Sequence, residues 1–375
     1  MTGTVTVAVD GTPLYRRVDG IGRYSANLVA ATARARPDWR FVVVGFADDR
    51  SRPYLLPELP NVEQVFLPFP RRLYQAAYSY GVRVPVTRWL PPLDVLLATN
   101  YTVFPWLPGV PSAVVVYDLT YVDLPQVVDA RNLGHLRRTV PRTMRTADRV
   151  LAISPFTAER IDATFPAHPP VTIVDCALDE TFLGGRSTPS PAAGLPGLPE
   201  QYVLCVGTLE PRKNLVTLLR AYAALDEELR DRYPLVVVGR QGWGAHEVPS
   251  DVPADVVSSV RFTGYVQDAE LPAVYRGARL FVFPSRYEGF GLPLLEAMAC
   301  GVPAVVSAIP PFEAIGGPLV DYADPDDPGS FSAAIGAALR ADATERTEAA
   351  RAAARTWTWE RSAQQLLGAL EDLRD

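Results

Sequence analysis

The residues best suited to chemistry lie where an apolar run ending at Phe283 gives way to a glycine-containing turn and then to a helix-like run. Gly289 and Gly291 fall in that turn, where backbone N–H groups can approach a ligand closely. Pro293 suits the first helical turn, because its missing N–H costs nothing there. Such a helix N-terminus binds anions, so the sequence predicts a site for a pyrophosphate group.

Charged side chains surround this turn in the sequence. Glu288 falls just before the expected helix, and Glu296 lies about one turn inside it. Each of these carboxylates can accept hydrogen bonds from hydroxyl groups of a ligand. Arg212 and Lys213 follow another apolar run and can supply a bidentate and a point-charge contact to phosphate oxygens. Lys213 is the only lysine among 36 basic residues. Together these residues predict a site for a ligand with phosphates and hydroxyls.

Residues 288–303 resemble the E-x7-E motif of the family-four retaining glycosyltransferases, without a gap through E-G-F-G-L-P-L-L-E-A-M-A-C-G-V-P. Residues 206–215 resemble the GTLEPRKN segment of that family. The resemblance implies the GT-B fold and a nucleoside-diphosphate sugar, GDP- or UDP-linked, as co-substrate, with no cofactor and no metal. It also implies that Arg212 and Lys213 hold the donor diphosphate, that Glu288 contacts the sugar and that Glu296 holds the ribose.

Further donor-binding positions follow from the same resemblance. The segments 238–240 and 262–266 resemble the strand ends that surround the donor base and ribose in this family. The expected donor-binding residues are Gly20, Gly22, Gly207, Gly239, Arg240, Tyr265, Val266, Gly289, Phe290, Gly291, Leu292 and Glu296.

The first half of the chain carries two more candidate segments. Residues 19–24 open a helix and resemble the family's GIGRY loop, which implies that Gly20 and Gly22 face the donor phosphates. Tyr117 stands where the family usually has a histidine beside the transferred sugar. A phenol has a pKa near 10, so it cannot titrate near neutral pH as an imidazole does. Asp118 either orients or deprotonates the acceptor, or caps the next helix.

Short apolar, β-branched runs alternate with helix-like stretches along the whole chain. Because these runs are apolar at consecutive positions, they suit parallel strands covered on both faces. The alternation predicts an α/β fold with two Rossmann-like doubly wound domains facing across a cleft, where ligands of such folds bind.

A stretch rich in Gly, Pro and Ser between the two halves predicts the domain boundary. We expect an acceptor-side domain at 1–185, a linker at 186–199 and a nucleotide-sugar-binding domain at 200–355. Residues 356–375 are expected to form a terminal helix that packs back on the N-terminal domain.

Composition excludes several classes of protein. The 375 residues carry a net charge of −6, which disfavours nucleic acid as a partner. No apolar run approaches the roughly 18 residues that span a bilayer, and the start lacks a secretory signal, so we expect a cytoplasmic protein. The three cysteines and three histidines lack metal-site spacing, and residues 324–327 (Asp-Pro-Asp-Asp) fit a turn better than an Asp-x-Asp metal motif.

Two segments are basic or aromatic. Residues 131–149 hold six arginines, and residues 71–80 combine Arg71 and Arg72 with three tyrosines. Such segments are either solvated helix faces or surfaces that meet an anionic acceptor or lipid headgroups, so peripheral membrane contact stays open.

The resemblance therefore implies a metal-independent, retaining glycosyltransferase that moves a hexose to a hydroxyl of a glycan, a lipid-linked acceptor or a small molecule. The departing diphosphate is expected to assist deprotonation of that hydroxyl on the front face of the sugar. Mannose from a guanosine donor is the favoured substrate, and a uridine donor stays open. Two alternatives are a catalytically inactive sugar-nucleotide-binding protein, and a nucleotide-sugar epimerase or phosphorylase.

Overall fold

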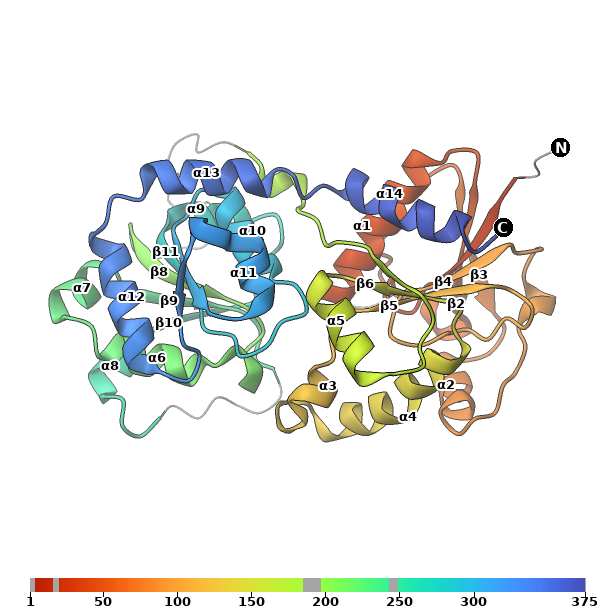
Figure 1. Ribbon diagram of the computed structural model, residues 1–375, viewed down its shortest axis with the longest axis horizontal. Coiled ribbons are helices and arrows are strands. Elements are labelled where there is room, and N and C mark those ends of the chain that lie inside the picture. Colours follow the sequence, from red (N-terminus) through yellow and green to blue (C-terminus); the bar gives the residue numbers. More distant parts are fainter. Residues whose placement is uncertain (1–3, 16–19, 185–196, 243–248, 375) are drawn as a thin grey trace. The chain divides into compact units, whose positions relative to one another are not determined.

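The computed structural model describes residues 4–15, 20–184, 197–242 and 249–374. The chain divides into two compact units, one formed by Met1–Ala177 with Thr358–Asp375 and the other by Leu178–Trp357. Each unit is built around one parallel β-sheet, as the alternation of apolar runs and helices predicts (Figure 1).

The first unit contains a seven-stranded sheet in the order β3-β2-β1-β4-β5-β6-β7. Its strands are β1 (Thr6–Asp10), β2 (Arg40–Phe46), β3 (Val62–Leu67), β4 (Val95–Ala98), β5 (Ser112–Val116), β6 (Arg149–Ala152) and β7 (Val171–Ile173). Its helices are α1 (Gly20–Ala35), α2 (Arg71–Ser79), α3 (Thr120–Asp123), α4 (Ala130–Thr146), α5 (Pro155–Thr164) and α14 (Trp359–Glu371). Single 3-10 turns lie at η1 (Ala47–Asp49), η2 (Thr87–Trp89) and η3 (Pro125–Val127).

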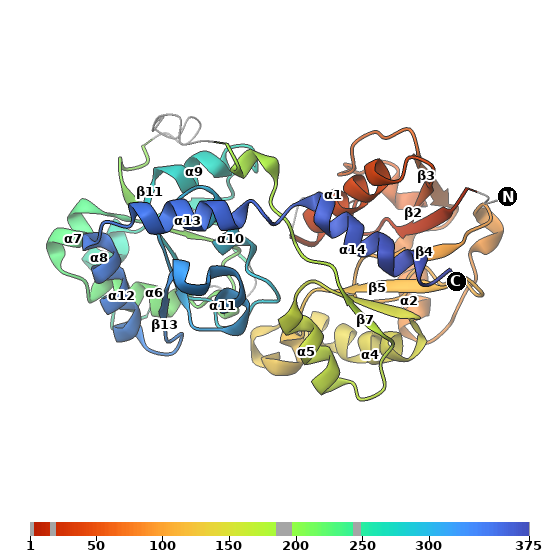
Figure 2. The ribbon, with the colours of Figure 1, turned by 45° about the horizontal axis from the view of Figure 1, so that its top comes forward.

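Helices cover both faces of this sheet. Helices α1 and α14 pack together over one face, and α2, α4 and α5 lie over the other (Figures 1 and 2). The central strands β1, β4 and β5 are buried at every position, which explains why their apolar residues do not alternate with polar ones.

The second unit contains a six-stranded sheet in the order β10-β9-β8-β11-β12-β13. Its strands are β8 (Tyr202–Val206), β9 (Leu235–Val238), β10 (Arg261–Gly264), β11 (Ala278–Phe283), β12 (Ala304–Ser307) and β13 (Asp321–Ala323). Its helices are α6 (Leu215–Ala223), α7 (Glu227–Arg232), α8 (Ala254–Ser259), α9 (Leu271–Gly277), α10 (Leu292–Ala299), α11 (Pro310–Gly316), α12 (Pro328–Arg340) and α13 (Thr344–Ala354), with 3-10 turns η4 (Glu180–Phe182), η5 (Pro211–Lys213) and η6 (Gly317–Leu319).

Strand order fixes where each unit can bind a ligand. The connections reverse direction between β1 and β4 in the first sheet, and between β8 and β11 in the second. In doubly wound folds the loops at the carboxyl ends of the strands diverge at such a reversal and leave room for a ligand. The segments that follow β8 and β11 are therefore the structural starting point for the candidate site.

The boundary between the units differs from the expected one. The first unit ends at Ala177 rather than at residue 185, because residues 178–184 pack with the second unit. There the buried ring of Phe182 lies against Tyr275 of α9, with ring centroids 5.9 Å apart. Most of the expected linker at 186–199 lies outside the described residues. At the other end of the chain, α14 belongs to the first unit and packs along α1.

Candidate functional site

The predicted cationic pair follows β8 in the second unit. After Val206 the chain turns at Gly207, and Arg212 and Lys213 form the end of η5. The glutamate turn follows β11, which lies beside β8 in the sheet although two other strands separate them in the sequence. The parallel sheet thus brings residues about 75 positions apart to one edge.

Asn214 holds the cationic turn in place. Its backbone is left-handed (φ 58°), a conformation that non-glycine residues seldom adopt, and its side chain is only 3% exposed. The side-chain amide donates to the Pro284 carbonyl at 3.0 Å and to the Pro325 carbonyl at 2.7 Å. One side chain therefore fixes the loops after β8, β11 and β13 against one another.

Arg212, Lys213 and Glu288 form a compact charged cluster with Glu210. Lys213 Nζ lies 2.6 Å from Glu288 Oε1, and Arg212 Nη1 lies 2.9 Å from Glu288 Oε2. Arg212 Nε also lies 2.6 Å from Glu210 Oε1, and Ser285 Oγ donates to Glu288 Oε1 at 2.6 Å. Two cations and two carboxylates thus balance formally, and both side-chain oxygens of Glu288 face cations.

The electrostatics of the cluster follow from burial and charge together. Burial alone would raise the pKa of Glu288, but the charges of Arg212 and Lys213 and hydrogen bonds from Lys213 and Ser285 lower it to about 2. Burial, followed by the charge of Arg212, lowers the pKa of Lys213. An incoming diphosphate would supply negative charge to Arg212 and Lys213 and so compete with Glu288 for them.

The low pKa of Glu288 predicts a pH-dependent contribution to stability. A carboxylate whose pKa is lower in the folded than in the unfolded state stabilises the fold above its ordinary pKa, and this contribution disappears as pH falls through the folded value. We expect Glu288→Gln to lower the free energy of unfolding by at most about 3 kcal/mol at pH 7, and the difference from wild type to narrow below pH ~4.5. Urea denaturation of both proteins at pH 7 and pH 3.5 measures this difference in the free energy of unfolding. A difference that does not change with pH would contradict this assignment.

Helix α10 begins as the glycine turn predicts. Its N-cap is Gly291, whose φ of 126° favours glycine and whose added Cβ would lie 2.9 Å from the Phe312 ring. Pro293 falls in the first turn. Glu296 lies one turn inside the helix, is only 3% exposed, and accepts a hydrogen bond from the buried Tyr275 hydroxyl at 2.9 Å. The turn and helix have the predicted form, and Tyr275 is the partner that the motif alone does not reveal.

Three strand ends lie side by side in the second unit. Gly207 donates its N–H to the Val238 carbonyl at 2.9 Å, and Gly239 donates to the Gly264 carbonyl at 2.9 Å. A Cβ at Gly239 would lie 1.8 Å from the Gly207 carbonyl oxygen, so only glycine allows this approach. The Arg240 guanidinium lies 4.7 Å from the centre of the half-exposed Tyr265 ring.

The remaining predicted donor-binding residues occupy the edges of these loops. Val266 is buried just beyond Tyr265, Gly289 is buried in the turn before α10, and Leu292 is the first residue of α10. The buried ring of Phe290 lies 5.2 Å from Trp357, edge to face. The second unit thus places its predicted donor residues around the ends of β8 to β11.

The candidates of the first unit form a separate group. Tyr117 follows β5, and its buried hydroxyl donates to the Thr99 carbonyl at 2.7 Å and lies 3.1 Å from Ser25 Oγ of α1. Asp118 accepts a hydrogen bond from the Thr120 N–H at 3.0 Å, but the N-cap of α3 is Leu119, which follows it. Asp118 therefore stabilises the turn before α3 without occupying its N-cap, and its role toward an acceptor stays a prediction.

Gly20 and Gly22 lie in the first turn of α1, at the end of the helix that also carries Ser25. Gly20 is exposed and has space around it, whereas Gly22 is buried. Asp19, which opens the predicted loop, lies outside the described residues. The predicted glycines are thus placed at a helix N-terminus near the carboxyl end of β1.

Several residues that shape the site carry no obvious sequence signal. Glu210 and Asn214 lie inside the segment singled out for its cations, where Glu210 pairs with Arg212 and Asn214 donates to a carbonyl of another loop. Ser285 and Tyr275 become recognisable only when their carboxylate partners are seen. Asn214 and Tyr275 make contacts 70 and 21 positions away along the chain, whereas Glu210 and Ser285 contact residues two and three positions away.

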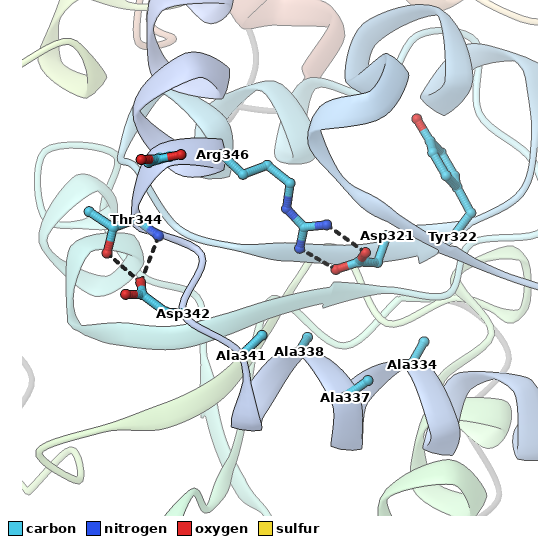
Figure 3. A pocket seen from close by; sticks show the side chains of 10 residues that line it. Asp321, Tyr322, Ala334, Ala337, Ala338, Ala341, Asp342, Thr344 and Arg346 are labelled. Atoms are coloured by element: carbon cyan, nitrogen blue, oxygen red, sulfur yellow. Dashed lines mark hydrogen bonds and ion pairs between the residues drawn. The ribbon is translucent and has the colours of Figure 1, made fainter.

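A surface pocket of about 680 Å³ in the second unit lies between α12, β13 and the start of α13 (Figure 3). Four alanines of α12 and its end form its floor, and two of its charged groups pair with each other: Arg346 binds Asp321 through two contacts of 2.7 and 2.5 Å. Asp342 accepts hydrogen bonds from the Thr344 N–H and hydroxyl. None of the predicted donor-binding residues lines this pocket.

Two further searches concern only the described part of the chain. Within it, no three His, Cys, Asp or Glu side chains come close enough together to hold a metal ion. No helix among these residues combines the length and apolar character required to cross a bilayer. The three cysteines, Cys176, Cys205 and Cys300, are buried, as their apolar surroundings predict, and none forms a disulfide bond within the described residues.

Comparison with known proteins identifies the family of the chain. A family described as "Glycosyl transferases group 1" matches residues 192–357. O-antigen chain mannosyltransferase B of Escherichia coli is 35% identical over 270 residues, which are 68% of this chain and 68% of that protein. Serotype-specific mannosyltransferase WbdA of Escherichia coli is 35% identical over 44% of this chain, and the chain spans only 21% of it.

A solved structure shares the fold over nearly the whole length. Sucrose-phosphate synthase of Thermosynechococcus elongatus superposes with a TM-score of 0.76 and 20% identity, covering 98% of this chain and 99% of that one. The two parallel-sheet units are those of the GT-B fold. With the family match and the mannosyltransferase relative, these findings place the chain among the group 1 glycosyltransferases.

Proposed function

We propose that the protein transfers a hexose, with retention of configuration, from a nucleoside-diphosphate donor to an acceptor hydroxyl. The observation that carries the proposal is the cluster of Arg212, Lys213 and Glu288 at the carboxyl ends of β8 and β11. Mannose is the favoured sugar, because O-antigen chain mannosyltransferase B aligns with this chain over two thirds of the length of both proteins. A guanosine donor is the first choice and a uridine donor the second.

The charged cluster supplies the chemistry that the leaving group needs. The bond between the anomeric carbon and the diphosphate oxygen breaks, and the negative charge that develops there is stabilised by Arg212 and Lys213. The acceptor oxygen forms the new bond to the same carbon, on the same face. Its proton passes to an oxygen of the departing diphosphate, so no separate protein base is required. Glu288, released from one cation, would contact the sugar.

A panel of nucleoside diphosphates and their sugars tests this proposal. We expect GDP to raise the melting temperature more than UDP or ADP, because a ligand bound only to the folded state stabilises it by mass action. We also expect slow release of nucleoside diphosphate from the matching sugar nucleotide. Stabilisation by the nucleotide without any such release, with and without added hydroxyl acceptors, would favour a binding protein that does not catalyse transfer.

Activity is expected to persist in excess chelator. Arg212 and Lys213 supply positive charge for the diphosphate, and the Asp324–Asp327 segment is a turn in which Asp324 accepts from the Asp326 N–H and Asp327 from the Gly329 N–H. The rate of donor turnover in roughly 5 mM EDTA should therefore stay within about twofold of the rate without EDTA. Loss of turnover in EDTA that Mg²⁺ or Mn²⁺ restores would show that the diphosphate is held by a metal.

A further inference from the structure

An exposed apolar segment lies on the first unit. Among the described residues, seven large apolar side chains are exposed to solvent. Four of these seven lie within the twelve residues from 73 to 84. Leu73 on α2 is 67% exposed, Tyr80 just after the helix is 83% exposed and Val82 is 56% exposed, with Val84 close behind. Exposed apolar groups gathered in this way are typical of an interaction surface.

The same segment and its neighbouring helix carry several arginines and no acidic residue of their own, although the buried Arg71 pairs with Asp49 at 3.6 Å. Residues 70–93 contain four arginines and no acidic residue, and α4 contains five arginines and no acidic residue. Seven of these side chains are exposed: Arg72, Arg83, Arg88, Arg131, Arg137, Arg138 and Arg145. Because the whole chain has a net charge of −6, this local excess runs against the overall balance.

Packing places the two segments together. Helix α2 contacts α4 on the same face of the sheet, and Arg142 of α4 donates to the Tyr78 carbonyl of α2 at 3.2 Å (Figures 1 and 2). Helix α4 is amphipathic: Val140 and Met144 are buried, while Arg137, Arg138 and Arg145 point to solvent. We call residues 72–84 and the exposed arginines of α4 the α2–α4 face.

We propose that the α2–α4 face docks on an anionic lipid bilayer. Arginines bind the phosphates and other anionic headgroups, and Leu73, Tyr80 and Val82 insert their side chains among the headgroups and upper acyl chains. A nucleic acid or an acidic protein would match the charge, but neither explains why the exposed aliphatic side chains lie in the same segment. The combination of positive charge and exposed apolar groups favours a membrane surface.

Vesicle cosedimentation of the full chain tests the proposal. We expect binding to vesicles of 70% phosphatidylcholine and 30% phosphatidylglycerol, and at least about tenfold weaker binding to phosphatidylcholine alone. Arg137→Glu with Arg138→Glu should weaken binding to the anionic vesicles at least about tenfold. Leu73→Ser with Tyr80→Ser should weaken it by a similar factor, and this effect should persist in 0.5 M NaCl, where charge is largely screened.

A matched control makes the same change of charge elsewhere. Arg34→Glu with Arg355→Glu replaces two exposed arginines outside the α2–α4 face, and binding should stay within about twofold of wild type. Circular dichroism checks that each variant folds, and donor hydrolysis in solution should not change, which separates this test from that of the proposed activity. Equal loss of binding in the control, no effect of Leu73→Ser with Tyr80→Ser, or equal binding to neutral vesicles would each overturn the proposal.

Discussion

Lys213→Ala should lower donor turnover by about 10²–10³-fold, which is the effect of removing one group that stabilises developing negative charge. Lys213 Nζ reaches Glu288 Oε1 at 2.6 Å and lies 4.8 Å from the centre of the Phe283 ring, so its position is fixed before a donor arrives. A fixed cation needs little reorganisation as the diphosphate departs. Steady-state release of nucleoside diphosphate from the sugar nucleotide measures the effect.

The same substitution also leaves Glu288 with fewer partners, and a loss of stability could be mistaken for a loss of chemistry. The matched control is the double variant Lys213→Met with Glu288→Gln, which removes both buried charges together and so leaves none unpaired. We expect this double variant to recover much of the melting temperature lost in Lys213→Ala while turnover stays low. Recovery of turnover along with stability would show that Lys213 acts only as a structural counter-ion.

Glu296→Ala should weaken the binding of the nucleoside diphosphate by about 10- to 100-fold, the range for losing hydrogen bonds to a charged acceptor. Glu296 is nearly buried, and Tyr275 orients its carboxylate through a 2.9 Å hydrogen bond. A carboxylate held in this way can accept hydrogen bonds from ribose hydroxyls with little loss of side-chain entropy. Isothermal titration calorimetry with GDP and UDP measures the change.

Tyr275→Phe is the control for Glu296, because it removes the orienting hydrogen bond and keeps the carboxylate. We expect it to weaken nucleotide binding by less than about tenfold, because the Glu296 carboxylate that would contact the ribose is still present. If both variants lowered the melting temperature equally and left nucleotide affinity unchanged, Glu296 would have a structural role and the ribose assignment would be wrong.

The sequence predicts the sheets well because their strands are buried on both faces. The β-branched, mostly apolar runs Val5–Val9 and Tyr202–Val206 favour central parallel strands, and β1 and β8 contain them except for Val5. The domain boundary was predicted less well. Glycine and proline mark the stretch after Gly184, but the contact of Phe182 with Tyr275 joins residues 93 positions apart and carries no local signal.

In the candidate site, too, features that depend on neighbouring residues can be predicted from the sequence, whereas contacts between distant residues cannot. The glycine turn and the helix that begins after Gly291 follow from local residue types, and the structure has them where the pattern predicts. The ion pairs of Glu288 depend on β11 lying beside β8, which is a property of strand order. Likewise, the contact of Tyr117 with Thr99 and Ser25 depends on which strands and helix are neighbours. The residue types therefore single out the charged candidates, but the sequence does not predict the ion pairs and hydrogen bonds that hold their side chains in place.

The proposed reaction breaks the bond between a sugar and its nucleoside diphosphate and keeps the anomeric configuration. Time-resolved proton NMR of the sugar released from GDP-α-mannose, and from UDP-α-glucose in parallel, measures both properties at once. We expect the α-anomer to appear first together with free nucleoside diphosphate, and Lys213→Ala to suppress both signals. Initial release of the β-anomer, or cleavage that does not depend on Lys213, would rule out the proposed reaction.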